Sequence, residues 1–261
     1  FHIVEPKAVW KLYTENAYEM DSFYRHFHYA FGCTLKDSNP LLEDKLKHAT
    51  EYVEGLYQNW YLKELTGCWT NAISDNLASL GYVSEIAKQR DFYSRYIRPL
   101  AGKNTRAFVI ISDALRYEVA AELCDTLIRT TKGTAKLEAM QAIFPSITKF
   151  GMAALLPGRK ISVDEDMGVY VEELPTSSTQ DREKVLCIGN SNSVAIQYND
   201  VLSMKRAERR ELVSGKEVVY IYHNTIDAIG DKAPTENKVF EACEDAIQEI
   251  SNILRIIVND M

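Results

Sequence analysis

The sequence has 261 residues, of which 46% are hydrophobic and 26% charged, a composition typical of a globular protein with one large domain or two smaller ones. It contains no run of 18 apolar residues and no basic start before an apolar run, so we expect neither a transmembrane helix nor a signal peptide, and we predict a cytoplasmic protein. The formal net charge of −7 argues against a broad nucleic-acid-binding surface, although a local basic cleft is compatible with it.

The cysteines are widely spaced and form no C-x-x-C pair, which disfavours both a zinc knuckle and a disulfide scaffold. We expect them to be reduced and mostly buried. The sequence begins with Phe1 and ends at Met261, directly after an apolar helical run, so we interpret it as a piece of a longer protein. The five cysteines are Cys33, Cys68, Cys124, Cys187 and Cys243.

Residues 1–100 carry aromatic and apolar side chains at helical spacing and predict an all-helical region of four or five helices. Such stripes are typical of core packing, and a base-stacking or partner surface is the alternative. The turn-rich segment 99–105 is predicted to be a hinge. The residues expected to interrupt the helices are Gly32, Asn39-Pro40, Gly67 and Gly81.

After the hinge, strands alternate with helices, which predicts an α/β fold with parallel strands. In such a sheet, ligands bind at the carboxyl ends of the strands. No glycine-rich phosphate loop follows any of the strands. The predicted strands are 107–111, 136–143, 183–188 and 217–222, the predicted helices are 114–130, 147–156 and 235–258, and a small hairpin is expected over 163–171.

Three polar segments follow predicted strands and contain residues suited to phosphate chemistry. Asp113 directly follows the first strand, where it is either a metal-binding carboxylate or the N-cap of the next helix. Ser146 and Thr148 lie at a predicted helix start, where a hydroxyl can attack a phosphate held by free amide groups, or can simply cap the helix.

The third segment, 222–232, contains two carboxylates four residues apart, Asp227 and Asp231, with Gly230 between them and His223 before them. Carboxylates with an imidazole suit zinc, manganese or magnesium. The alternative is a plain polar turn. No Ser–His–Asp arrangement can be identified from the sequence.

Taken together, the three segments resemble the PglZ domain of BREX phage-defence systems, whose core is similar to alkaline phosphatases and nucleotide phosphodiesterases. The resemblance covers roughly residues 100–261, and the helical residues 1–100 resemble the region that precedes that domain. It implies that 101–261 is the truncated N-terminal half of a PglZ domain, a partial alkaline-phosphatase-like, mostly parallel sheet flanked by helices. The motifs are VIISDALRYE (109–118), PSITKFGMAALLP (145–157) and YIYHNTIDAIGDK (220–232).

The resemblance also implies roles for individual residues. Asp113 corresponds to a ligand of the first metal, and Thr148 to the nucleophile, which also binds that metal. Asp227 and Asp231 correspond to the pair that holds the second metal, with Asp231 standing where the superfamily has histidine. The implied cofactors are two divalent metal ions, zinc first, with manganese or magnesium as alternatives. As substrate-binding residues we expect Arg116, His223 and Asn224.

The implied function is a metal-dependent phosphoric-ester hydrolase, either a phosphatase, a phosphodiesterase or a nuclease, that forms a phosphothreonine in anti-phage defence. The alternative is a catalytically degenerate scaffold within a multi-protein defence complex. Expected partners are other BREX components, with the DNA methyltransferase as one candidate; nucleic acid is a candidate substrate, and no membrane is involved. Because later ligands of the superfamily have no match here, we expect these 261 residues alone to be inactive.

Overall fold

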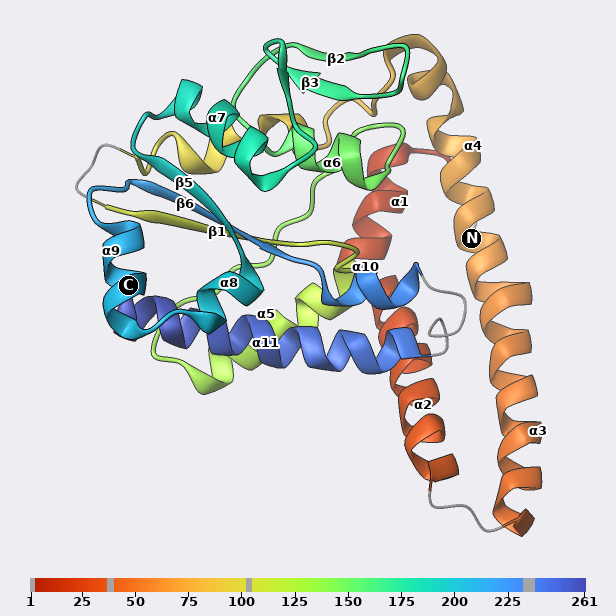
Figure 1. The fold of residues 1–261 in the computed structure, drawn as a ribbon. Coiled ribbons are helices and arrows are strands. Elements are labelled where there is room, and N and C mark those ends of the chain that lie inside the picture. Colours follow the sequence, from red (N-terminus) through yellow and green to blue (C-terminus); the bar gives the residue numbers. More distant parts are fainter. Residues whose placement is uncertain (1–2, 37–39, 102–104, 232–237) are drawn as a thin grey trace. The chain divides into compact units, whose positions relative to one another are not determined.

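The computed structural model describes residues 3–36, 40–101, 105–231 and 238–261 (Figure 1). The chain forms two compact units, and each is assembled from three separate segments. The first comprises 1–86, 115–139 and 229–245, and the second comprises 87–114, 140–228 and 246–261. These units differ from the two consecutive domains, meeting at residue 100, that we expected. None of the helices in the described part of the chain is long and apolar enough to cross a membrane.

The first unit is helical, as predicted for residues 1–100. Its core contains Val9, Ala17, Tyr61 and Leu65, and the Tyr61 hydroxyl donates a hydrogen bond to the Ala17 carbonyl at 2.6 Å. The elements that lie wholly in this unit are α1 (Pro6–Leu12), η1 (Tyr13–Ala17), α2 (Tyr18–Lys36), α3 (Pro40–Leu56), η2 (Tyr57–Leu62), α4 (Lys63–Leu80) and α5 (Tyr117–Thr130).

Glycine marks a helix end at one of the three expected positions. Gly81 follows α4 with a left-handed φ of 72°, a conformation that glycine adopts without steric cost. Gly32 and Gly67 instead lie inside α2 and α4, so the expectation that they interrupt helices was wrong. A glycine inside a helix costs only about 1 kcal/mol, which neighbouring helical residues and packing can outweigh.

The second unit is α/β, which confirms the predicted fold class. Its elements are η3 (Gln89–Asp91), η4 (Tyr93–Ile97), β1 (Ala107–Ser112), α6 (Thr148–Ala154), β2 (Ile161–Val163), β3 (Val169–Val171), β4 (Leu174–Pro175), α7 (Thr179–Gly189), β5 (Ser193–Gln197), α8 (Tyr198–Ser203), α9 (Arg206–Val213) and β6 (Val218–His223). The boundary between the units falls inside α10 (Thr225–Gly230) and α11 (Val239–Asp260).

The main sheet of the second unit has three parallel strands in the order β1-β6-β5. All six residues of the central strand β6 are buried, as its apolar and β-branched sequence predicts for a strand covered on both faces. One face packs on α6 and α7, and the other on α8, α9 and the part of α11 that belongs to this unit (Figure 1). The central strand is therefore buried between two layers of helices.

Two predicted strands are absent from the structure. Residues 136–143 form no strand; Gln141 makes a single bridge, accepting from the Gln89 amide at 2.9 Å and donating to the Ala87 carbonyl at 2.7 Å. Residues 183–188 lie in α7, because the Ser178 hydroxyl accepts the Asp181 amide at 3.0 Å and starts a helix. Strand β5, which was not predicted, follows this helix and forms the sheet edge.

The other predicted elements of the second half are confirmed. Strands 107–111 and 217–222 correspond to β1 and β6, and the hairpin over 163–171 corresponds to the antiparallel pair β2–β3. Helices 114–130 and 147–156 correspond to α5 and α6, and the long C-terminal helix is α11, although residues 235–237 of that prediction lie outside the described residues. All five cysteines are free; Cys243 is buried and Cys33 exposed, so the thiols are less buried than expected.

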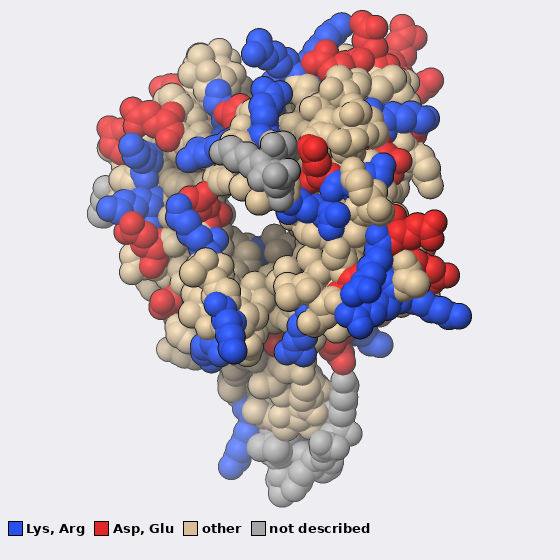
Figure 2. All heavy atoms as spheres, turned by 90° about the vertical axis from the view of Figure 1, so that its left-hand side faces the viewer, with Lys and Arg blue, Asp and Glu red and all other residues tan. Residues whose placement is uncertain are grey.

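Charged side chains of both signs are scattered over the face drawn in Figure 2. In the view of Figure 2, Lys and Arg side chains lie among Asp and Glu side chains. In the second unit, Arg206 and Arg209 both contact the carboxylate of Asp260, at 3.2 and 2.9 Å. Part of the positive charge of α9 is therefore neutralised within the chain.

Candidate active site at the carboxyl ends of the central strands

The carboxyl ends of β1 and β6 lie side by side in the second unit. In the parallel register, Ser112 at the end of β1 pairs with His223 at the end of β6. The Asp113 amide then donates to the His223 carbonyl at 2.9 Å, so the backbone pairing continues one residue beyond β1. The sheet thus fixes the backbone of Asp113 and the start of the polar segment after His223 at one edge, where α/β proteins bind ligands.

Asp113 begins a sharp turn. Its side chain is half-buried, and its Oδ1 accepts a hydrogen bond from the Ala114 amide at 3.0 Å. Ala114 has a left-handed φ of 59°, which costs a non-glycine residue about 1 kcal/mol. Helix α5 has Arg116 as its N-cap residue, so Asp113 does not cap it and the capping alternative fails. Backbone strain next to a half-buried carboxylate is typical of functional sites.

His223 is 1% exposed and joins three elements of the second unit. Its Nδ1 lies 2.9 Å from the Ser112 hydroxyl and its Nε2 lies 2.7 Å from Oε2 of Glu249 on α11. Because a carboxylate only accepts, Nε2 carries the proton and donates to Glu249, and Nδ1 accepts from Ser112. Thr225 donates to the same Glu249 oxygen at 2.6 Å, and the Tyr198 ring packs edge-on against the imidazole at 4.9 Å.

This network leaves His223 with both ring nitrogens engaged. The imidazole therefore orients the end of β6 in this structure, and its expected part in substrate binding stays a prediction. Asn224, the next residue, is exposed, and its carbonyl accepts the Ala228 amide at 3.1 Å as α10 begins. Asp227 is half-buried in the first turn of α10, four residues after His223.

Thr148 is the first residue of α6, and its side chain is exposed. The N-cap residue is Ile147, which has no capping group, and the Thr148 hydroxyl has no hydrogen-bond partner among the described residues. Capping therefore does not explain the hydroxyl at this position. The opposite face of α6 packs on the sheet, because Phe150 and Met152 belong to the same core cluster as Val109 and Ile111 of β1.

One sequence argument for Thr148 was wrong. We expected each of the three polar segments to follow a strand directly, but residues 136–143, which precede this segment, form no strand and pair only through the bridge at Gln141. The Tyr220 hydroxyl of β6 donates to the Leu155 carbonyl at 2.8 Å, so α6 is fixed by its C-terminal end to the face of the sheet.

Arg116 and Asp231, two other expected site residues, belong to the first unit. Arg116 precedes α5, and its guanidinium lies 5.9 Å from the centre of the Phe240 ring. Asp231 is exposed in a turn at the end of α10. Their parts in phosphate and metal binding stay predictions.

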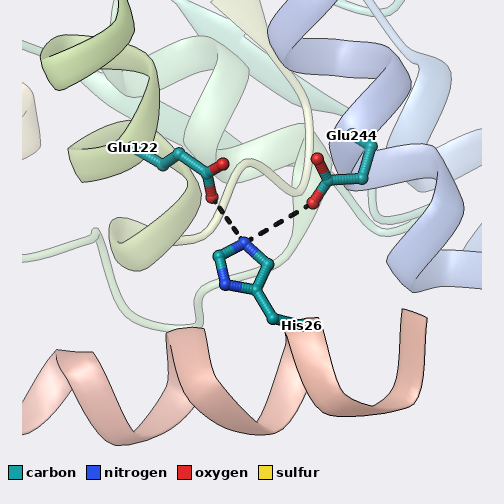
Figure 3. Close-up of side chains that lie close together, drawn as sticks. All are labelled: His26, Glu122 and Glu244. Atoms are coloured by element: carbon teal, nitrogen blue, oxygen red, sulfur yellow. Dashed lines mark hydrogen bonds and ion pairs between the residues drawn. The ribbon is translucent and has the colours of Figure 1, made fainter. Parts of the chain in front are cut away.

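A second group with metal-ligand side chains lies in the first unit, where His26 of α2 points between Glu122 and Glu244 (Figure 3). Among the described residues, these are the three His, Cys, Asp or Glu side chains whose ligand atoms lie within 4.8 Å of one another. The buried Arg25 forms ion pairs with both carboxylates. Because this guanidinium already pairs with both Glu122 and Glu244, we interpret the group as an ion-pair network that joins α2, α5 and α11.

Comparison with known proteins places these observations in a family. A family model described as the BREX system PglZ alkaline phosphatase-like domain matches residues 92–261. The chain is 39% identical over 256 residues to an alkaline phosphatase-like protein PglZ of Bacillus cereus (strain H3081.97), covering 98% of this chain and 29% of that protein. It is 37% identical over 264 residues to an alkaline phosphatase-like protein BrxZ of Escherichia coli O9:H4 (strain HS), covering 99% of this chain and 30% of that protein. The chain thus spans about three-tenths of the length of these relatives.

Proposed function

Because the chain belongs to the PglZ family of BREX alkaline phosphatase-like domains, we propose that it carries part of the active site of a metal-dependent phosphoric-ester hydrolase acting in anti-phage defence. The nucleophile in this proposal is Thr148. The observation that carries it is the register of β1 and β6, which puts the segments bearing Asp113 and Asp227 at one edge of a parallel sheet. A threonine hydroxyl that neither caps its helix nor pairs within the described chain supports the assignment.

The proposed reaction is in-line phosphoryl transfer. Thr148 Oγ1 loses its proton to solvent and bonds to phosphorus, while the bond to the ester oxygen breaks and that oxygen takes up a proton. Water then attacks the phosphothreonine, which restores the hydroxyl and releases the phosphate. Divalent cations, when bound, lower the pKa of the attacking hydroxyl and neutralise charge on the phosphoryl oxygens.

The side chains proposed to hold these cations are Asp113, Thr148, Asp227 and Asp231, and all of them offer oxygen. Oxygen donors suit Mg²⁺ or Mn²⁺ better than zinc, which prefers nitrogen and sulfur. His223 does not supply the missing imidazole in this structure, since both its ring nitrogens are hydrogen-bonded. We therefore favour magnesium or manganese, and we expect the remaining ligands in other parts of the whole protein.

His223, Ser112 and Glu249 act in this proposal as positioning residues. They hold the carboxyl end of β6 against that of β1, so the backbone carrying Asp113 stays fixed while substrate binds. Arg116 and Asn224, both exposed, are the proposed contacts for the phosphoryl oxygens.

The test uses the whole protein that contains this chain and measures hydrolysis of bis(p-nitrophenyl) phosphate with Mn²⁺ or Mg²⁺. We expect Thr148→Val to lower the rate by about 10³-fold or more, as loss of a nucleophile does, and Thr148→Ser to retain part of it. The matched control is Ser146→Ala, which removes a neighbouring exposed hydroxyl and should leave the rate unchanged. A Thr148→Val protein with the parent rate would exclude this nucleophile.

Metal content separates catalysis from a purely structural role. Asp113→Asn and Asp227→Asn should each lower the bound metal and the rate together. If both variants and Thr148→Val still support full phage resistance in cells, the chain acts as a scaffold for the defence complex, which we propose contains other BREX components. Supplying plasmid DNA, nucleotides or phosphopeptides to the active protein would identify the substrate class.

A further inference from the structure

The first unit contains a cavity of about 380 Å³, and Arg116 is the one residue of its lining that also has a part in the proposed hydrolysis. Its walls come from α1, η1, α2, η2, α4 and the start of α5. Two tryptophans, Trp10 and Trp69, line it with their ring centres 5.9 Å apart, and Tyr13 and Tyr57 add two more aromatic rings. Because the π face of an aromatic ring attracts a cation, such walls favour a ligand that is apolar in body and positive in charge.

Two carboxyl groups lie among these rings. Asp21 accepts hydrogen bonds from the hydroxyls of Tyr13 and Tyr57, at 2.7 and 2.8 Å, which holds its carboxylate in a fixed orientation. Glu118 is 1% exposed, and its Oε1 has no hydrogen-bond partner among the described residues. A buried acceptor without a partner costs free energy, so a ligand whose donor group satisfies it would gain binding free energy.

With Glu118 ionised, the charged side chains that line the cavity carry a net negative charge, and with Glu118 protonated they carry none. Asp21 and Glu118 face one cation in the lining, Arg116, whose guanidinium also lies over the Phe240 ring. Arg25, the other nearby cation, is already paired with Glu122 and Glu244.

We propose that this cavity is a binding site for an organic cation, an alkylammonium or guanidinium group whose N–H donors reach Glu118 and Asp21 and whose apolar part lies between Trp10 and Trp69. The same chemistry is offered by a free small molecule and by the side chain of a lysine or arginine in a polypeptide. A neutral ligand of the same shape lacks the charge that the two carboxylates favour.

Binding of a cation is coupled to the proton of Glu118. Burial raises the pKa of this carboxyl group, so it binds a proton more readily than an exposed glutamate does. An incoming cation favours the ionised form and releases that proton, so affinity should increase as the pH rises through this pKa. The other titratable or charged groups that act on Glu118 are Asp21 and Arg25 of α2, Tyr13 of η1, Tyr61 of η2, Arg116 before α5 and Cys243 of α11.

The experiment measures binding of n-pentylammonium, methylguanidinium and the neutral analogue 1-pentanol to the whole protein by calorimetry and by quenching of tryptophan fluorescence. We expect 1-pentanol to bind at least about tenfold more weakly than n-pentylammonium, a ratio equal to about 1.4 kcal/mol. N-acetyl-lysine methylamide forms the second arm: binding tighter than that of n-pentylammonium indicates a polypeptide side chain, and weaker binding indicates a free small molecule.

Glu118→Gln, which keeps the shape and removes the charge, should weaken n-pentylammonium binding at least about tenfold. Asp125→Asn is the matched control, since Asp125 is exposed on the same helix and outside the cavity, and it should change the affinity less than about twofold. Calorimetry in buffers of different ionisation enthalpy gives a test without any variant, because cation binding should release a proton. Equal affinity for 1-pentanol and n-pentylammonium, or no proton release and no effect of Glu118→Gln, would overturn the proposal.

Discussion

Replacing Glu249 with alanine tests whether the network around His223 holds the site edge together. The substitution removes two hydrogen bonds to one carboxylate oxygen, from His223 Nε2 at 2.7 Å and from the Thr225 hydroxyl at 2.6 Å. Hydrogen bonds to a charged group contribute about 1.5–3 kcal/mol each, but the Glu249 side chain is 34% exposed, so water replaces part of what is lost. The His223 side chain is fully buried, and its Nε2–H would keep only the longer contact with the Thr225 hydroxyl, at 3.2 Å.

We therefore expect Glu249→Ala to lower the free energy of unfolding by about 2–3 kcal/mol and Glu249→Gln, which keeps an acceptor, by about 1 kcal/mol. Urea unfolding of the protein followed by circular dichroism measures both. Gln248→Ala is the control, because Gln248 is exposed on the same helix, and it should change stability by less than about 0.5 kcal/mol. A loss for Glu249→Ala no larger than that of the control would show that the network does not stabilise the sheet edge.

Three further predictions concern single groups. Ser178→Ala removes the N-cap of α7 and should lower the free energy of unfolding, measured in urea, by about 1 kcal/mol. The Ser178 hydroxyl, together with Lys184, also lowers the pKa of Asp181 to about 2. The ionised Asp181 therefore stabilises the fold above its ordinary pKa, and an acid titration of stability should show this contribution disappear as the pH falls toward about 2. The raised pKa of Glu118 has the opposite effect on stability. Protonated Glu118 contributes fully to stability below the pKa of the unfolded state, and this contribution is lost as the pH rises through the pKa of the folded state. Glu118→Gln should therefore flatten the decline of the melting temperature with rising pH, and an unchanged slope would contradict the burial argument. Ala114→Gly should raise the melting temperature or leave it unchanged, since glycine relieves a left-handed backbone at a cost in chain entropy of similar size, about 1 kcal/mol; a clear decrease would mean that the Ala114 methyl group packs usefully.

The central strands could be predicted because their patterns leave few alternatives. The run Val218–Tyr222 is apolar and β-branched with a polar segment directly after it, and β1 has the same character, so both strands and the positions of Asp113 and Asp227 after them followed from sequence. Helix α7 was predicted as a strand because its buried Val185 and Leu186 stand together and show no helical period within a short run. The deciding signal was Ser178 with Asp181 three residues later, which resembles a helix N-terminus.

The His223 network could not be predicted, because its members lie far apart in the sequence. Ser112 and His223 are 111 residues apart, and Glu249 is another 26 residues further along. Glu249 stands on an amphipathic helix among other charged residues, and nothing in its local sequence distinguishes it from a solvated glutamate. The segment 136–143 shows the opposite case, since its strand-like sequence finds no neighbouring strand beyond the bridge at Gln141.

The discontinuous first unit bears on how the protein folds as it is synthesised. Arg25 pairs with Glu122 and Glu244, which follow it by 97 and 219 residues, so the ribosome must deliver nearly the whole of this chain before the second pair can form. Until then Arg25 lacks one of its counter-charges, and the helices synthesised first lack their contact with Glu244 of α11. Contacts of such long sequence separation slow folding and leave intermediates exposed to aggregation. Expression at lower temperature or with chaperones should therefore increase the yield of folded protein. Shortening the chain from its C-terminal end should not, because it removes the part that carries Glu244.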